Sequence, residues 1–260
     1  MSNVPSKSSN SDLTTVCLIP ARSGSKRVAH KNILDINGHP LLAYTISAAL
    51  DSAEFLAVVV STDDEQYADI ARHYGALVLE LRPSELARDG SPDIDWVEFE
   101  IRQLHKSGYS FDQFALLRPT NPFRSKATIK RALEHFRRNQ WADSLRAVER
   151  TSLHPGKMWV KRGEQLFPVL PVQSGSTDWF SSPTQTLPEV WVQNASLEIS
   201  RVPNVTTQRN ITGNRILGFE TSDLEGFDIN SPEDVVLLTH YLRQSPNALP
   251  TVKSHPYSAK

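Results

Sequence analysis

Four basic residues lie within ten positions of one another around a single glycine, in a segment that can bind a polyanion. These residues are Arg22, Lys26, Arg27 and Lys31. Gly24 allows a ligand to approach the backbone closely, and the small neighbours Ser23 and Ser25 leave their backbone N–H groups accessible. Guanidinium and ammonium groups form strong charge-assisted hydrogen bonds with phosphate oxygens. The segment therefore predicts a phosphate-binding loop rather than an ordinary solvated one.

An apolar run directly before this loop predicts the strand that carries it. Val16 to Ile19 is continuously apolar and stops at Pro20. A short apolar run that ends at a proline and a glycine-containing loop is typical of a buried strand. The loop has neither the G-x-x-x-x-G-K-[ST] spacing of a P-loop nor the G-x-G-x-x-G spacing of a dinucleotide-binding turn. Phosphate binding of another type is therefore expected.

Two oxygen-bearing side chains stand close together ahead of a helix start near the C-terminal end. Asp228 and Asn230 are alternate residues of an extended segment, so their side chains are expected to point the same way. Magnesium in proteins is bound by few carboxylates together with substrate phosphates and water. Ser231, Pro232 and Asp234 follow as the N-cap, first and third positions of a helix. The pattern predicts a magnesium site just before this helix.

Apolar runs alternate with helical patterns along the chain, which predicts an α/β domain with a mostly parallel sheet. Expected strands lie at 16–19, 55–60, 76–81, 114–117, 143–149 and 191–200, with a short extended piece at 33–36. Expected helices cover 41–50, the segment from an N-cap at Ser61 or Thr62 to 74, a segment from 92, 126 to about 139, and 232 to about 243. The basic residues of the helix ending near 139 are interpreted as its solvent face. A hairpin is expected within 157–169.

Composition limits the class of protein. The 260 residues suit one large domain, or one domain with a subordinate lobe. A net charge of −1 argues against a nucleic-acid partner, and no apolar stretch has the length of a membrane span. The single cysteine excludes an intramolecular disulfide framework, so a cytoplasmic location is expected. Residues 1–12 are expected to be a disordered tail, 13–244 the domain, and 245–260 a loose tail.

Several motifs resemble one enzyme family. I-P-A-R-S-G-S-K-R followed by K-N resembles the signature loop of the acylneuraminate cytidylyltransferases, which make CMP-sialic acid and CMP-activated relatives of other nonulosonic acids. Further segments match in family order, namely R-P-S-E-L-A at 82–87 with Asp89, R-P-T-N-P-F-R at 118–124, V-Q-N-A at 192–195 and D-I-N at 228–230. The chain departs from the family at Arg118, where Gln is common, at Asn121, where Ser is common, and at Val192, where Arg is common.

The resemblance implies a fold and a reaction. The fold is a three-layer α/β/α arrangement with a mostly parallel sheet of the nucleotide-diphospho-sugar transferase (Rossmann-like) type. A small dimerisation lobe is inserted at about 151–190, and the enzyme is a homodimer. The reaction is Mg²⁺-dependent transfer of CMP from CTP to the anomeric hydroxyl of a 2-keto nonulosonic sugar acid, with release of pyrophosphate.

The resemblance also assigns residues to roles. The catalytic residues are Arg22 at the α-phosphate, Lys26 on the triphosphate and Asp228 on the metal. The nucleotide-binding residues are Ala21, Arg22, Ser23, Gly24, Ser25, Lys26, Lys31, Asn32, Arg82 and Asp89. The sugar-binding residues are Arg118, Thr120, Asn121 and Asn194. The metal ligands are Asp228 and Asn230.

Four readings of the function stay open from the sequence. The acceptor is a nonulosonic acid, an octulosonic acid or a sugar 1-phosphate, because one general fold serves all three. A nucleotide-binding protein with decayed catalysis is a fourth reading, motivated by Arg118, by Val192 and by Asn230, which contributes less charge than the Asp that the family also has there. Arg118 either pairs with a substrate carboxylate or is a solvated loop residue.

Overall fold

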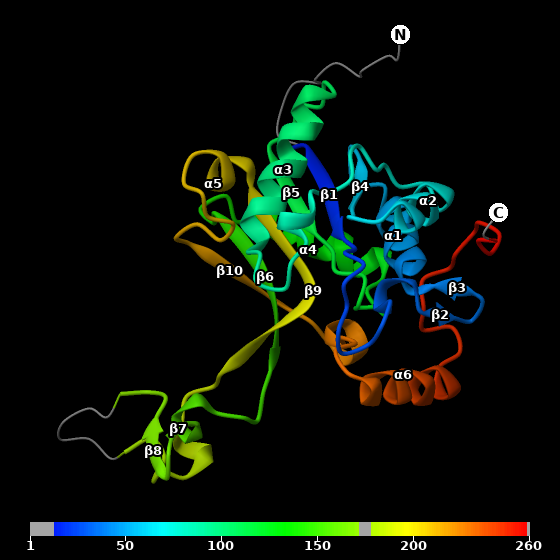
Figure 1. Ribbon diagram of the computed structural model, residues 1–260. Coiled ribbons are helices and arrows are strands. Elements are labelled where there is room, and N and C mark those ends of the chain that lie inside the picture. The colour runs from blue at the N-terminus through cyan, green and yellow to red at the C-terminus, as the bar shows by residue number, and fades with distance from the viewer. Residues whose placement is uncertain (1–12, 172–177, 259–260) are drawn as a thin grey trace.

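The computed structural model describes residues 13–171 and 178–258, and its centre is a six-stranded sheet (Figure 1). The strand order is β10-β6-β9-β5-β1-β4, and all strands run in one direction except β9, which is antiparallel to both of its neighbours. The strands are β1 (Thr15–Pro20), β4 (Val58–Ser61), β5 (Gln113–Leu116), β6 (Ser144–Arg150), β9 (Trp191–Arg201) and β10 (Ile216–Glu220). The predicted mostly parallel sheet is confirmed.

Helices cover both faces of the sheet and make three layers. They are α1 (Leu41–Ser52), α2 (Glu65–His73), α3 (Asp93–Lys106), α4 (Lys126–Arg138) and α5 (Val202–Thr206). A further helix, α6 (Pro232–Gln244), packs with Leu41 and Tyr44 of α1 rather than on a face of the sheet. Alternate residues of β1 point to opposite faces. Cys17 and Ile19 pack with α1, α2 and α4, whereas Val16 and Leu18 pack with α3 and α5. The central strand is therefore buried on both sides, which explains its continuous apolar run.

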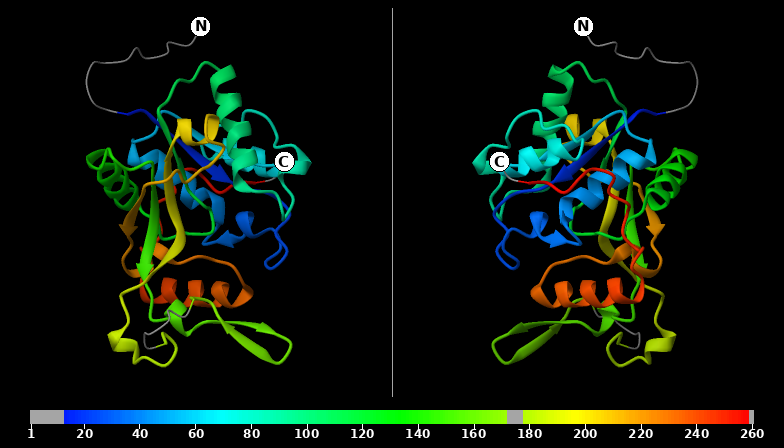
Figure 2. Two further views of the ribbon diagram at one scale, coloured as in Figure 1. Left: turned by 90° about the vertical axis from the view of Figure 1, so that its left-hand side faces the viewer. Right: turned by 90° about the vertical axis from the view of Figure 1, so that its right-hand side faces the viewer.

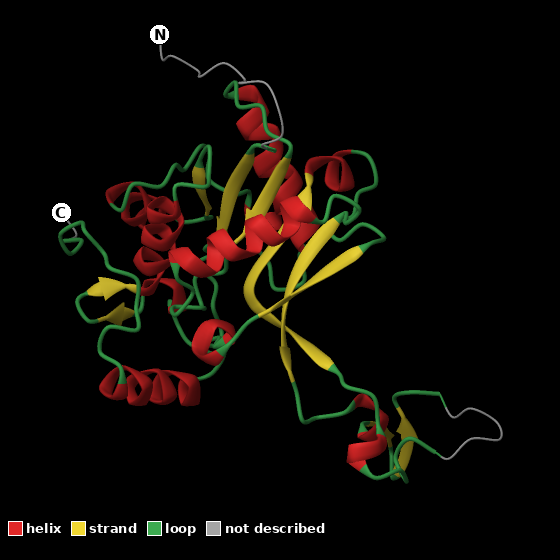
Figure 3. Cartoon of the chain, turned by 180° about the vertical axis from the view of Figure 1, so that it is seen from behind, coloured by secondary structure: helices red, strands yellow, loops and turns green. Residues whose placement is uncertain are grey.

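A lobe projects from the far ends of β6 and β9, well away from the sheet (Figures 1 and 3). It contains the antiparallel hairpin of β7 (Trp159–Arg162) and β8 (Gln165–Pro168). Gly163 begins the tight turn with a φ of +59°, a left-handed conformation that favours glycine. The predicted hairpin and the inserted lobe are both present in the described residues.

Some local predictions were wrong. The segment 76–81 is not a strand, because only Leu77 forms a bridge, to Val59 of β4. The N-cap of α2 is Asp64, whose carboxylate accepts a hydrogen bond from the Tyr67 backbone N–H at 3.1 Å, and not Ser61 or Thr62. The piece at 33–36 begins as a 3-10 turn and continues as the small hairpin of β2 (Asp35–Ile36) and β3 (His39–Pro40).

The C-terminal segment 245–258 is not the loose tail that its composition predicted. It runs from α6 back to α2 (Figure 2). Lys253 pairs with Asp51 at 2.7 Å, and the Tyr257 backbone N–H donates to the Tyr74 hydroxyl at 3.1 Å. The predicted tail at 1–12 lies outside the described residues. None of the helices in the described part of the chain has the length and apolar content that crossing a bilayer requires.

Candidate functional site

The loop after β1 and the segments after β4 and β5 leave the sheet at one edge, because these three parallel strands are neighbours. Ligands of open α/β sheets bind at the carboxyl ends of the strands. The basic loop 21–32 follows β1, and residues 118–124 follow β5. The edge therefore collects the segments that the sequence assigned to the nucleotide and to the sugar.

Two cations of the basic loop are paired with one carboxylate. Arg22 Nη1 lies 2.8 Å from Asp89 Oδ1, and Lys26 Nζ lies 2.5 Å from Asp89 Oδ2. Hydrogen bonds from Lys26 and Arg22 hold the pKa of the Asp89 carboxyl below its usual value. The Lys26 side chain is 81% exposed, so this pair can open to solvent or to a ligand. The three predicted nucleotide residues Arg22, Lys26 and Asp89 therefore lie together.

The backbone of the loop is held from two sides. Asn32 Nδ2 donates to the Arg22 carbonyl at 3.0 Å. Asp63 accepts hydrogen bonds from the Ser23 backbone N–H at 2.8 Å and from the Ser23 hydroxyl at 3.0 Å. Sequence analysis missed this role of Asp63. At Gly24, a Cβ would meet no atom within 4 Å, so the space beside this residue is open to a ligand.

Arg82 lies in the protein interior, with an exposed fraction of 4%. Its Nε donates to the Ser61 hydroxyl at 3.0 Å, its Nη2 donates to the Ser61 carbonyl at 3.0 Å, and its guanidinium stacks 4.6 Å from the Trp96 ring centroid. Burial lowers the pKa of Arg82 to about 10, although Glu100 opposes this. Arg82 is thus a buried residue at the start of the loop at 82–89, and its contact with the nucleotide stays a prediction.

Asp228 and Asn230 share one side of their segment, as predicted. Asn230 Nδ2 donates to Asp228 Oδ2 at 2.5 Å. Asp228 Oδ1 is buried and has no hydrogen-bond partner among the described residues. A buried carboxylate oxygen normally has a partner. An Asp228 Oδ1 without a hydrogen-bond partner in the described part of the chain therefore fits a cation site.

Lys31 joins the basic loop to this segment, because its Nζ donates to the backbone carbonyl of Ile229. Burial lowers the pKa of Lys31, and the nearby carboxylate of Asp228 opposes that shift. Within the described ranges no three His, Cys, Asp or Glu residues cluster as metal ligands. Magnesium needs no such cluster when substrate phosphates complete its coordination.

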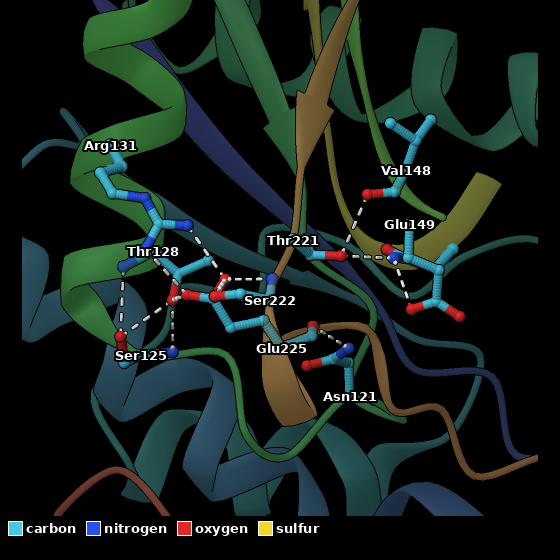
Figure 4. Close-up of polar contacts among 10 residues, drawn as sticks. Asn121, Ser125, Thr128, Arg131, Val148, Glu149, Thr221, Ser222 and Glu225 are labelled. Atoms are coloured by element: carbon cyan, nitrogen blue, oxygen red, sulfur yellow. Dashed lines mark hydrogen bonds and ion pairs between the residues drawn. The ribbon is translucent and has the colours of Figure 1, made fainter. Parts of the chain in front are cut away.

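A cavity of about 390 Å³ joins the sugar-assigned and metal-assigned residues. Its charged and amide side chains are Arg118, Glu149, Gln193, Asn194, Glu198, Asp228 and Asn230. Asn194 Nδ2 donates to Thr221 Oγ1 at 2.7 Å and to Glu149 Oε2 at 3.3 Å. Thr120 and Asn121 do not line this cavity. Asn121 is buried, and its Nδ2 donates to the Glu225 carbonyl at 2.7 Å (Figure 4).

Arg118 is held in a charged network rather than solvated in a loop. Its Nη2 lies 2.6 Å from Asp93 Oδ2 and 3.5 Å from Glu198 Oε1, and Glu198 also pairs with Arg146. Burial alone would lower the pKa of Arg118, but Asp93 and Glu198 raise it above its usual value. Sequence analysis missed the partners of Arg118. Arg146 and Glu198 are opposite charges at paired positions of β6 and β9, and this pairing cannot be read from the sequence.

Comparison with known proteins identifies relatives of this chain. The family model described as "Cytidylyltransferase" matches residues 16–154, more than half of the chain. The N-acylneuraminate cytidylyltransferase of Escherichia coli is 46% identical over 122 residues, which is 46% of this chain and 28% of that protein. The CMP-N,N'-diacetyllegionaminic acid synthase of Legionella pneumophila is 45% identical over 119 residues, which is 46% of this chain and 51% of that protein. The matches thus span about half or less of these relatives.

A solved structure of CMP:2-keto-3-deoxy-manno-octonic acid synthetase complexed with CTP has the same fold. Its TM-score is 0.62 at 18% identity, and the alignment covers 89% of this chain and 99% of that one. The agreement at this identity is one of fold. The fold, the family-model match and the arrangement of the basic loop at the sheet edge lead to one conclusion: the chain belongs to the cytidylyltransferase family.

Proposed function

We propose that this chain transfers CMP from CTP to the anomeric hydroxyl of a nonulosonic sugar acid and releases pyrophosphate. One observation carries the proposal. The cavity that contains Arg118 also contains Asp228, and Lys31 connects the Asp228 segment to the basic loop. A triphosphate on the loop and a sugar acid in the cavity would therefore meet beside the Asp228 carboxylate.

The basic loop would bind the triphosphate by an exchange of partners. Phosphate oxygens would replace the Asp89 carboxylate beside Arg22 and Lys26, since both kinds of group accept from the same donors. Arg22 would then lie at the α-phosphate and stabilise the charge that develops during in-line attack. Fixed donors aimed at developing charge are among the largest contributions to enzymatic rate. Lys26 and Lys31 would hold the rest of the triphosphate and orient the leaving pyrophosphate.

Asp228, with Asn230 beside it, would hold Mg²⁺. The open Asp228 Oδ1 is the feature that supports this assignment. When bound, the metal would neutralise charge on the phosphate oxygens. The chain's own part is to keep Asp228 turned toward the cavity, through the hydrogen bond from Asn230.

The cavity has a polarity that would orient the sugar acid. Arg118 is its cation, and its side-chain contacts with the described residues all involve Nη2, so Nε and Nη1 would donate to a substrate carboxylate. Glu149, fixed by Asn194, would accept hydrogen bonds from the opposite end of the sugar. The names of the two relatives favour a nonulosonic acid, whereas the octulosonic acid enzyme shares the fold at low identity.

The projecting lobe supports a homodimer. Trp159 and Leu166, which share one face of the hairpin, are 41% and 52% exposed, and exposed apolar side chains on one face of a projecting element support a contact surface. We therefore include a second copy of this chain as the lobe's partner, and a cytoplasmic location, in the proposal. Sedimentation at micromolar concentration tests the dimer, with a Leu166→Glu variant expected to sediment as a monomer.

Pyrophosphate release tests the reaction. The wild-type chain is incubated with Mg²⁺, each of the four nucleoside triphosphates, and a panel of nonulosonic acids, octulosonic acids and sugar 1-phosphates. Release with CTP and a nonulosonic acid alone is expected. Release with an octulosonic acid or a sugar 1-phosphate instead would reassign the acceptor. Binding of CTP without release on any acceptor would point to a nucleotide-binding protein without this activity.

A further inference from the structure

One carboxylate ties the segment that carries Asp228 to a helix that is distant in the sequence. Glu225 lies on the 3-10 turn Asp223–Gly226, between β10 and α6, and its side chain points at the start of α4 (Figure 4). Arg131 Nη1 and Nη2 donate to its two oxygens at 3.1 and 2.9 Å. This two-pronged pair is the strong geometry for arginine and carboxylate.

The same carboxylate has neutral donors as well. Thr128 Oγ1 donates to Glu225 Oε1 at 2.6 Å, and the Ser222 backbone N–H donates to Oε2 at 3.0 Å. Burial by itself raises the pKa of Glu225, but hydrogen bonds from Arg131 and Thr128 bring that pKa below its usual value. The Glu225 side chain is 15% exposed, whereas the Arg131 side chain is 50% exposed, so the carboxylate is mostly buried and its arginine partner reaches it from the surface. Arg131, interpreted from the sequence as part of a solvent face, is therefore an anchor.

Backbone contacts on either side of Asp228 complete the arrangement. Asn121 Nδ2 donates to the Glu225 carbonyl at 2.7 Å, and the Ile229 backbone N–H donates to the Thr120 carbonyl at 2.9 Å. Asp228 lies between these two fixed points. The chain also passes Glu149 and Asn194 so closely that any side chain at Gly226 would collide with both. A shift of this segment would therefore move both Asp228 and the cavity wall.

We propose that Glu225 is a positioning residue for the metal-binding carboxylate, and that it acts through its pair with Arg131. The inference rests on the proposed function, because it concerns the Mg²⁺ that Asp228 would hold. Glu225 does not contact Asp228; it sets the path of the backbone three residues ahead of it. Residues that support metal ligands from behind typically change metal affinity by about 10- to 100-fold when they are replaced.

Calorimetric titration of CTP tests this without turnover, because no sugar acid is present. The Kd for CTP is measured in EDTA and in Mg²⁺, and the ratio of the two reports how far the metal strengthens binding. Glu225→Gln is expected to reduce this ratio by about 10-fold while the Kd in EDTA stays unchanged. Arg131→Met is expected to do the same, and the double variant no more than either one, since one pair is broken in each case.

The chain offers a matched control on the same helix. Arg137 Nη2 of α4 pairs with Glu54 Oε2 at 2.9 Å. Neither residue lines the cavity. Glu54→Gln is expected to change Tm but leave the CTP ratio at the wild-type value. Because the Arg131 side chain is half exposed, Arg131→Met keeps the test open if Glu225→Gln folds poorly.

Two results would overturn the inference alone. In one, Glu225→Gln and Arg131→Met both keep the wild-type ratio; in the other, Glu54→Gln lowers the ratio as much as they do. A wild-type chain that binds CTP equally with and without Mg²⁺ would overturn the proposed metal dependence, and this inference with it. The two failures are therefore distinguishable.

Discussion

The two segments that we propose to bind the triphosphate and the metal are held in different ways. In the basic loop, the side chains of Arg22 and Lys26 are 34% and 81% exposed, and both are paired with the partly exposed Asp89. In the proposed metal segment, residues 225–230, the Glu225 side chain is anchored by Arg131 and Thr128. Asp228 lies between the backbone contacts of Glu225 and Ile229.

The difference concerns what a ligand can replace. The partner of the loop cations is a carboxylate, which a phosphate can displace because it accepts from the same donors. The partners of the metal segment are a helix, a buried amide and a backbone carbonyl, none of which a nucleotide resembles. In the proposed function the loop would therefore rearrange on binding, whereas the metal segment would already be held in place, as efficient charge stabilisation requires.

The largest expected loss of kcat comes from replacing Asp228 in the proposed metal segment. Asp228→Asn keeps the shape of the side chain but removes its charge, so kcat is expected to fall by about 10³, the upper end for loss of one charge-stabilising group. The CTP Kd in EDTA should stay unchanged. Steady-state pyrophosphate release and calorimetry measure the two quantities. Asp223→Asn, an exposed acid on the same segment with a φ of +51° that Asn tolerates, is the control. Equal activity in both variants would remove Asp228 from the mechanism.

A smaller loss of kcat is expected from replacing Arg22 in the basic loop. Arg22→Ala should lower kcat by about 10² through loss of a donor at the α-phosphate, while the effect of Mg²⁺ on CTP binding persists. Arg27→Ala, which removes an exposed cation from the same loop, should cost far less. Similar kcat values for Arg22→Ala and Arg27→Ala in the pyrophosphate assay would mean that the loop acts through its total positive charge. The position of Arg22 would then not matter for kcat.

Local patterns predicted the elements that depend on local chemistry. The run at Val16–Ile19 became β1, Ser125 caps α4 through its hydroxyl, and Pro232 begins α6. Each outcome follows from neighbours in the chain, namely apolar burial on both faces, a capping oxygen and a proline at a first turn. The position of Asp228 beside Asn230 was predictable for the same reason, because alternate residues of an extended segment point the same way.

Local patterns failed where contacts with residues distant in the sequence determine the structure. The strand β10 contains Gly218 and exposes Ile216, so only its pairing with β6 makes it a strand. The segment 76–81 has strand composition, but it touches the sheet edge at Leu77 alone. The pair of Arg131 with Glu225 joins residues 94 positions apart, and no spacing rule reports such a contact.

The contrast between the segments should also appear as a dependence of stability on pH. Glu225 has a pKa below its usual 4.5 in the folded chain, so the stability it contributes is complete above pH 4.5 and is lost as pH falls through its folded value. Glu225→Gln is expected to destabilise by about 1–3 kcal/mol at pH 7, because buried donors lose an ionised acceptor. Thermal melting should show a gap in Tm between wild type and variant at pH 7 that narrows below pH 4. A constant gap would mean that the charge of Glu225 is not what stabilises the segment.

The smallest effect is expected where a ligand can replace the existing partner. Asp89→Asn leaves Arg22 and Lys26 without a competing charge, so CTP should bind about two- to five-fold more tightly at low salt, the range of an exposed ion pair. The gain should disappear at about 0.5 M salt, because exposed charges are screened there. Calorimetry of CTP without Mg²⁺ measures both conditions. Weaker binding in Asp89→Asn would instead show that Asp89 itself contacts the nucleotide, and the loop would then be as preset as the metal segment.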